Sequence, residues 1–88
     1  MVGSQVGNAD AAMDVRRRVG LNLQRLRRLA GLSQEELAHR ANVHQTYLSG
    51  VENGLRNPSI AVLDRIATAL DVDVAELLVR EASLGRQT

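Results

Sequence analysis

The sequence has 88 residues and contains no cysteine, tryptophan or phenylalanine, so that Tyr47 is its only aromatic residue. Without cysteine there is no disulfide framework and no thiolate metal site, which is typical of a reducing compartment. The core must be aliphatic, and in so short a chain this favours helices over a sheet. No apolar run reaches the length of a membrane span or of a signal peptide's apolar region. We therefore expect a soluble, cytoplasmic protein with one all-α domain.

Residues arranged for catalysis are also absent. Ser49 has no base at a supporting spacing, and a hydroxyl without one is a poor nucleophile. The two histidines, His39 and His44, are expected on different helices, with no carboxylate or cysteine at ligand spacing. No glycine-rich loop is suited to phosphate binding. We expect no enzymatic activity, no metal or other cofactor, and no small-molecule ligand.

Lysine is missing too, since all eleven basic residues are arginines, and they are unevenly distributed. Residues 1–30 carry six arginines and two aspartates, whereas residues 59–88 carry three arginines and five acidic residues. A chain with one basic end can present that end to a polyanion. For the three arginines at 16–18, a solvated helix face and a contact with phosphate both stay open.

Two short helices around a tight turn are predicted over residues 34–53. Ser33 can cap the first turn of the first helix, and Glu36 can bond back to it. Asn42 tolerates the left-handed conformation and marks the turn. Gly54 ends the second helix. The predicted pair is a helix-turn-helix unit.

The spacing of apolar residues gives each of these helices an inward and an outward face. The inward residues are Leu37, Ala38, Ala41, Leu48, Val51 and Glu52. On the second helix the outward residues are Gln45, Thr46, Ser49, Gly50 and Asn53. A face of short amides and hydroxyls without carboxylates suits the base edges and phosphates of a DNA major groove.

This pattern resembles the helix-turn-helix proteins of the phage repressor and Cro type, also called the xenobiotic response element family. The resemblance covers about residues 19–78. It lies in the strings GLSQEELA, TYLSGVENG and RNPS and in six fixed positions, which are Leu37, Ala38, Asn42, Val43, Leu48 and Val51. The last two strings are also similar to the controller proteins of restriction-modification systems.

The resemblance implies a five-helix, lambda-repressor-like fold and a transcriptional regulator that binds double-stranded DNA. It also implies that Arg27 pairs with Glu52 and so ties the first helix to the end of the recognition helix. The sequence departs from the family at four positions. Asn42 and Asp71 replace glycine, His44 replaces a capping serine or threonine, and Gly50 replaces what is often a long polar base reader.

The candidate DNA contacts follow from the outward face and the resemblance. They are Gln34, His44, Gln45, Thr46, Tyr47, Ser49, Gly50, Asn53, Arg56 and Asn57. Gln34 and the first amides of its helix would bind a phosphate, and Gln45 can read adenine. Gly50 leaves room for Tyr47 or Arg56 to reach in. Tyr47 fits core packing as well as DNA contact, and Arg56 and Asn57 fit either phosphate contacts or a solvated turn.

Outside the central unit, we expect a flexible arm over residues 1–13, a domain over 14–84 and a frayed end over 85–88. An apolar stripe predicts the first helix, ended by Gly31; it consists of Val15, Val19, Leu23, Leu26 and Ala30. Ser59 can cap a fourth helix and Asp73 a fifth. The candidate dimer surface consists of Val74, Leu77, Leu78 and Leu84.

A homodimer would place two recognition helices about 34 Å apart on a near-palindromic operator. Two protein-binding alternatives stay open. One is an antitoxin or interaction module of the same fold, and the other is a bridging protein that contacts DNA only incidentally.

Overall fold

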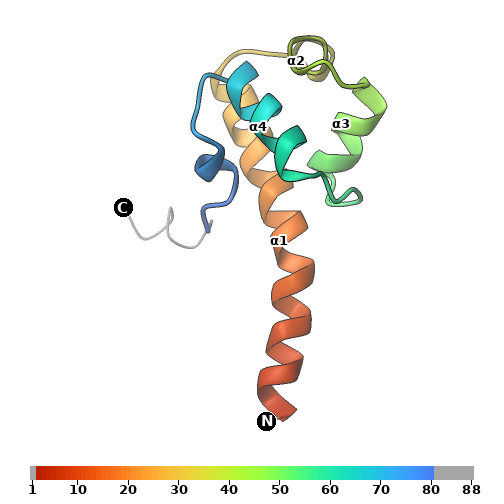
Figure 1. Ribbon diagram of the computed structural model, residues 1–88, viewed down its shortest axis with the longest axis vertical. Coiled ribbons are helices and arrows are strands. Elements are labelled where there is room, and N and C mark those ends of the chain that lie inside the picture. The colour runs from red at the N-terminus through yellow and green to blue at the C-terminus, as the bar shows by residue number, and fades with distance from the viewer. Residues whose placement is uncertain (1, 81–88) are drawn as a thin grey trace.

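The computed structural model describes the backbone of residues 2–80 and the side chains of residues 15–80. In this part the chain is all-helical, as the sequence predicts, and the shorter elements gather around the C-terminal half of the first helix (Figure 1). The elements are α1 (Val2–Leu29), α2 (Gln34–Ala41), α3 (Gln45–Glu52), α4 (Ile60–Ala69) and the 3₁₀ turn η1 (Val74–Leu77). Helix α3 lies on one side of α1 and η1 on the other (Figure 1). None of the helices within residues 2–80 has the length and apolar character needed to cross a bilayer.

Helix α1 begins at Val2, whereas the sequence predicts a flexible arm over residues 1–13. This stretch contains no proline, and a glycine inside a helix costs only about 1 kcal/mol, so that its polar composition does not prevent helix formation. The boundary between arm and domain stays a prediction. Residues 85–88 and Leu84, which the sequence assigns to a frayed end and to the dimer surface, lie outside the described residues.

The expected fifth helix is reduced to the single turn η1. Its start is as predicted, because the Asp73 carboxylate accepts a hydrogen bond of 2.8 Å from the Ala75 amide. The chain then leaves helical geometry because two of its carbonyls bond to α1. The Asn22 side-chain amide donates to the Leu77 carbonyl at 3.0 Å and to the Val79 carbonyl at 2.8 Å. The described residues therefore form four α-helices and one 3₁₀ turn, and not five α-helices.

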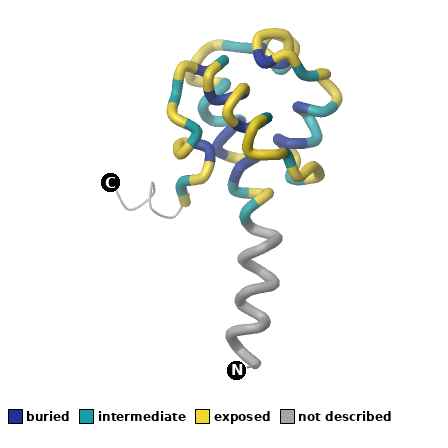
Figure 2. Tube along the Cα trace, viewed as in Figure 1, coloured by how far each residue is buried: buried dark blue, intermediate teal, exposed yellow. Residues whose placement is uncertain are grey.

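The core is aliphatic and is formed where the short helices face one another and α1 (Figure 2). On α1, Val19 and Leu23 are buried and Leu26 is partly buried, as the predicted stripe requires, while Ala30 lies beyond the end of the helix and is exposed. The inward residues predicted for α2 and α3 are confirmed. All six of them are buried: Leu37, Ala38, Ala41, Leu48, Val51 and Glu52.

All four α-helices end in the same motif, in which a residue with positive φ follows the helix and the next amide bonds back five positions. The residues with positive φ are Gly31, Asn42, Gly54 and Asp71. Asn42 forms the turn between α2 and α3, with φ 59° and ψ 48°, as its position in the sequence predicts. In two of the four motifs the residue with positive φ is therefore not glycine but Asn42 or Asp71, although only glycine adopts this conformation without steric cost.

Candidate nucleic-acid interface

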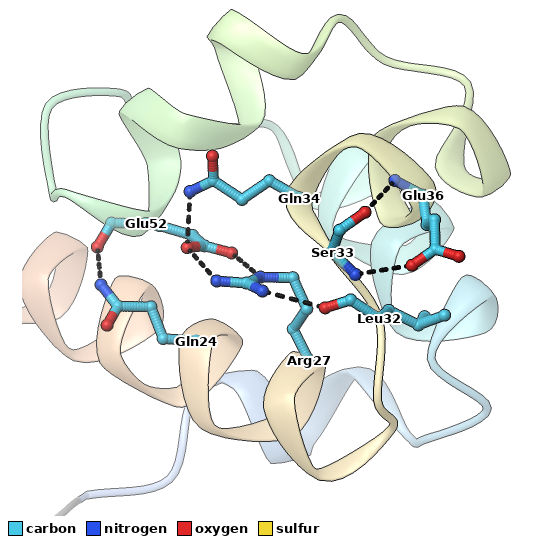
Figure 3. Close-up of polar contacts among 7 residues, drawn as sticks. All are labelled: Gln24, Arg27, Leu32, Ser33, Gln34, Glu36 and Glu52. Carbon is cyan, nitrogen blue, oxygen red and sulfur yellow. Dashed lines mark hydrogen bonds and ion pairs between the residues drawn. The ribbon is translucent and has the colours of Figure 1, made fainter.

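Helix α2 starts with a reciprocal pair of hydrogen bonds, which the sequence predicts. The Ser33 hydroxyl accepts a bond of 3.0 Å from the Glu36 amide, and the Glu36 carboxylate accepts one of 2.8 Å from the Ser33 amide (Figure 3). The bond from the Ser33 backbone is the main reason why the pKa of Glu36 lies below its ordinary value. The bonds fix the N-terminus of α2, whose unpaired amides carry the partial positive charge that suits a phosphate.

The carboxylate of Glu52, the last residue of α3, joins three elements (Figure 3). Arg27 of α1 donates to it twice, from Nε at 2.6 Å and from Nη2 at 3.1 Å. Gln34 of α2 donates to it from Nε2 at 2.9 Å. The same guanidinium donates from Nη1 to the Leu32 carbonyl at 2.9 Å, and the Gln24 amide donates to the Glu52 carbonyl at 3.0 Å. We call these groups the Glu52 network.

The Glu52 network is nearly closed to water, since the Glu52 side chain is 2% exposed and the Arg27 side chain 11%. Hydrogen bonding to Glu52 raises the pKa of Arg27, and burial acts in the opposite direction with a smaller effect. At this depth the attraction between two opposite charges offsets the cost of desolvation only when their geometry is good and their remaining donors and acceptors are hydrogen-bonded. The network therefore sets how α3 lies against α1 and the start of α2.

The structure has the pairing of Arg27 with Glu52 that the resemblance implies. The contact made by the Gln34 side chain differs from the expectation. Gln34 was expected to bind a phosphate, and in the structure one of its amide hydrogens bonds to Glu52. Its amide nitrogen has a second hydrogen, which is sufficient for one bond to a phosphate. The structure therefore adds a positioning contact to the role proposed for Gln34.

Gly20 is a structural residue that the sequence analysis did not single out. A Cβ atom added to it would lie 2.4 Å from the Glu52 carbonyl oxygen and 2.7 Å from the Val51 carbonyl oxygen. Helices α1 and α3 are thus in backbone contact at this point, and only glycine allows it. Its place next to Val19 in the apolar stripe is a weak signal for such a crossing.

Asn22 was likewise missed, although it is 2% exposed and donates to the last carbonyl of η1 and to the Val79 carbonyl after it. A polar residue within one turn of Val19 and Leu23 on a core-facing helix is the signal that could have indicated it. Such a residue can be buried only if partners satisfy its amide. Together with the Glu52 network, Asn22 fixes both sides of α1.

The outward face of α3 is accessible, and none of the ten candidate DNA contacts is buried. Gln45, Thr46 and Asn53 are exposed, while Ser49 and Gly50 are half-buried. Within helix α3 the only carboxylate is that of Glu52, which points inward. The face that remains presents amides and hydroxyls.

His44 stands at the N-cap of α3 and makes no side-chain hydrogen bond to the first turn. Together with His39 and Asn42 it lines a hollow at the turn between α2 and α3. Helix α3 therefore begins without the hydroxyl that serves α2 and α4 through Ser33 and Ser59.

Arg56 lies across the outer surface of α3 and takes the space that the missing side chain of Gly50 leaves. A Cβ atom on Gly50 would lie 2.7 Å from Arg56 Cγ and 3.4 Å from its Nε. The Arg56 guanidinium carbon stands 5.9 Å from the centre of the Tyr47 ring, within the range of a cation–π contact. Tyr47 is half-buried and packs against the core, so that its ring joins the core to the outer face.

The three arginines at 16–18 do not act as one patch. Arg18 donates from Nε to the Leu78 carbonyl at 3.1 Å, on the side of η1. The backbone of Arg17 lies against Gly54, directly after α3, and a Cβ atom on Gly54 would be 3.4 Å from Arg17 Cα. Arg16 lines a small apolar groove, of about 90 Å³, that also includes Asn57 and Leu78. Of these three arginines, Arg16 and Arg17 are exposed and Arg18 is half-buried.

The expected dimer surface needs one correction, because Leu77 is fully buried. It fills the core between α1 and α4 and is not available to a second subunit. The error arises because the 3₁₀ turn and the bonds from Asn22 direct Leu77 inward. Val74 is partly buried against the core, and Leu78 is 42% exposed.

Comparison with known proteins identifies the class of protein that this fold and this site define. The helix-turn-helix family pattern matches residues 23–77, which is more than half of the chain. The chain therefore belongs to the helix-turn-helix family. This confirms the resemblance to the phage repressor and Cro type.

Relatives within this family are regulators of transcription. The chain is 48% identical over 66 residues to an uncharacterised HTH-type transcriptional regulator, y4dJ, of Sinorhizobium fredii, covering 75% of this chain and 86% of that one. It is 41% identical over 61 residues to the regulator SinR of Bacillus subtilis, covering 68% of this chain and 55% of SinR.

Two solved structures share the fold. The restriction-modification controller protein C.AhdI from Aeromonas hydrophila has a TM-score of 0.69 and 42% identity, covering 70% of this chain and 94% of that chain. The master regulator for biofilm formation SinR, crystallised in complex with DNA, has a TM-score of 0.66 and 40% identity, covering 69% of this chain and 98% of that chain.

Proposed function

We propose that this protein is a transcriptional regulator that binds a near-palindromic operator as a homodimer, with α3 in the major groove. The observation that carries the proposal is the outward face of α3. It is a row of accessible amides and hydroxyls with no carboxylate, on a helix fixed from behind by the Glu52 network. A regulator of this kind acts where the DNA is, which in a bacterial cell is the cytoplasm.

Gln45 is the residue that we assign to base reading. It is exposed at the first position of α3, the end of a recognition helix that reaches the base edges. Its amide can donate to and accept from adenine at the same time, and a good pair of this kind gives about 1 to 3 kcal/mol of discrimination. Thr46, its exposed neighbour, can contact the thymine methyl group or a phosphate.

Phosphate contacts on both sides of α3 would fix its register in the groove. The first-turn amides of α2 and the second hydrogen of the Gln34 amide face one strand, in the manner of other helix N-termini that bind anions. Asn57 follows α3 in an exposed loop and would contact the backbone where the helix leaves the groove. Such contacts position the protein and carry no direct sequence information.

A second copy is part of the proposal because one recognition helix makes few base contacts. Leu78 is 42% exposed and Val74, four positions earlier, is half-buried, and we assign these two apolar residues near the end of the described chain to the dimer surface. Leu78→Ser is expected to weaken dimerisation in sedimentation velocity. Leu29→Ser, which changes a leucine that is 76% exposed at the end of α1, is the matched control.

The DNA-binding part is tested by selecting bound fragments from a randomised DNA library at about 150 mM salt, where non-specific attraction is reduced. The protein is run beside the double variant Gln45→Ala, Thr46→Ala. A second double variant, Asp64→Ala, Thr68→Ala, changes two exposed residues of α4 and is the control.

The proposal predicts a near-palindrome with half-sites about ten base pairs apart. The control variant should select the same sequence, and the Gln45, Thr46 variant should not. Binding that shows no sequence preference and disappears with salt would contradict the proposal. In that case the search should turn to a protein partner, such as a toxin covered by a module of this fold.

A further inference from the structure

The side chain that covers the middle of α3 belongs to the loop after it and not to the helix itself. Position 50 is a glycine, and the Arg56 stem packs so closely on it that a Cβ atom there would lie 2.7 Å from Cγ and 3.6 Å from Cδ. Gly50 is half-buried, while Arg56 itself is exposed. The outer surface of α3 at this point is therefore an arginine side chain.

The position of this arginine is defined on two sides. Gly50 receives the aliphatic stem, and the Tyr47 ring lies 5.9 Å from the guanidinium carbon. Since Tyr47 is anchored in the core, its ring gives the guanidinium a fixed surface. Among residues 15–80 no carboxylate pairs with the Arg56 guanidinium, so that its donors are available to a ligand.

We infer that Arg56 reads a guanine in the major groove in place of the side chain that Gly50 lacks. This inference rests on the proposed function and assigns a second base reader to the same face. The chemical reason is the shape of the guanidinium. Its two parallel N–H donors match the O6 and N7 acceptors of guanine, which is the commonest specific arginine contact with DNA. An arginine held against α3 by glycine and tyrosine needs little further ordering to make that contact.

The competing role for Arg56 is a simple phosphate contact, and the two roles predict different selectivity. A base contact fixes the base at one position of each half-site. A phosphate contact weakens binding equally for all sequences when it is lost, and reduces the salt slope by about one unit. Both roles depend on DNA binding. Only the base-reading role predicts that a substitution at Gly50 changes the preference for one base.

The test uses two variants that act on Arg56 by different routes. Arg56→Lys keeps the charge and loses the fork of donors. Gly50→Ala leaves Arg56 unchanged and displaces its stem, and because alanine favours helix more than glycine does, the fold should be retained. Arg65→Lys, on an exposed arginine of α4, is the matched control. Circular dichroism checks that each variant is folded.

Each variant is passed through the same library selection, and single duplexes that differ at the selected positions are then titrated. The expected result is a guanine in each wild-type half-site whose preference falls by roughly 5- to 150-fold in both Arg56→Lys and Gly50→Ala. The adenine preference assigned to Gln45 should stay unchanged in both variants, and Arg65→Lys should match the wild type.

Three results would overturn the inference. If Arg56→Lys keeps every selected position, Arg56 is not a base reader, and if only Gly50→Ala keeps them, Arg56 does not read in place of a side chain at position 50; either result overturns the inference while the proposed function stands. If the wild type selects no sequence at all, the proposed function fails and the inference fails with it. The two failures are distinguished by the wild-type selection alone.

Discussion

Removing one partner of the Arg27–Glu52 pair is expected to destabilise the fold strongly, although the intact pair itself contributes little net stability. In Arg27→Met the Glu52 side chain, which is 2% exposed, keeps only the bond from Gln34. Breaking a buried pair from one side costs about 3 to 5 kcal/mol, because one charge stays buried without a partner. Domains of this size are stable by only about 5 to 15 kcal/mol, so that roughly a fifth or more of the stability should be lost.

The measurement is thermal and urea unfolding, followed by circular dichroism. A domain of this length shifts its melting temperature by about 4 to 8 °C per kcal/mol, so that Arg27→Met should lower Tm by at least about 12 °C. Arg28→Met, which changes the neighbouring exposed arginine, should stay within about 0.5 kcal/mol of the wild type.

The double variant Arg27→Met, Glu52→Met separates the pair from its surroundings. Since it leaves no unpaired buried charge, it should be more stable than the sum of the two single variants predicts, with a coupling of about 1 to 3 kcal/mol. The reasoning would be refuted by single variants that each cost under about 1 kcal/mol, or by losses that simply add.

Three further predictions concern stability. Gly20→Ala forces apart the backbones of α1 and α3 and should cost about 1 to 3 kcal/mol in urea unfolding; an unchanged stability would contradict the backbone contact. His44→Ser supplies the missing cap on α3 and should raise stability by about 0.5 to 2 kcal/mol; an unchanged Tm would contradict the capping argument. Because the pKa of Glu36 is lower in the folded state, its contribution is present above about pH 4.3 and lost as the pH falls through the folded value. Tm should therefore drop less between about pH 6 and pH 3 in Glu36→Gln than in the wild type, and equal drops would count against this pairing.

The parts of the fold that local chemistry determines could be predicted from the sequence. The caps at Ser33, Ser59 and Asp73 and the left-handed turn at Asn42 depend on residues within a few positions of each other. The inward faces of α2 and α3 follow from helical spacing. These features hold because the tertiary structure agrees with the local preference.

The parts that depend on contacts between distant segments could not be predicted. Leu77 looks like one more apolar residue of a surface helix until Asn22 bonds to its carbonyl and directs the chain inward. The closeness of α1 and α3 at Gly20 and the position of Arg56 over Gly50 likewise arise only when separate elements meet. For the DNA-facing surface, the sequence indicated which residues point outward and that Tyr47 or Arg56 could reach over Gly50, but not which of these two side chains lies there.

The most direct test of the central claim is a crystal structure of the protein bound to a duplex taken from the library selection. The account predicts α3 in the major groove, with the Gln45 amide about 2.7 to 3.2 Å from the N6 and N7 atoms of one adenine. It also predicts two copies whose recognition helices lie about 34 Å apart. A complex in which another face contacts the DNA, or in which the α3 side chains touch only phosphates, would contradict it.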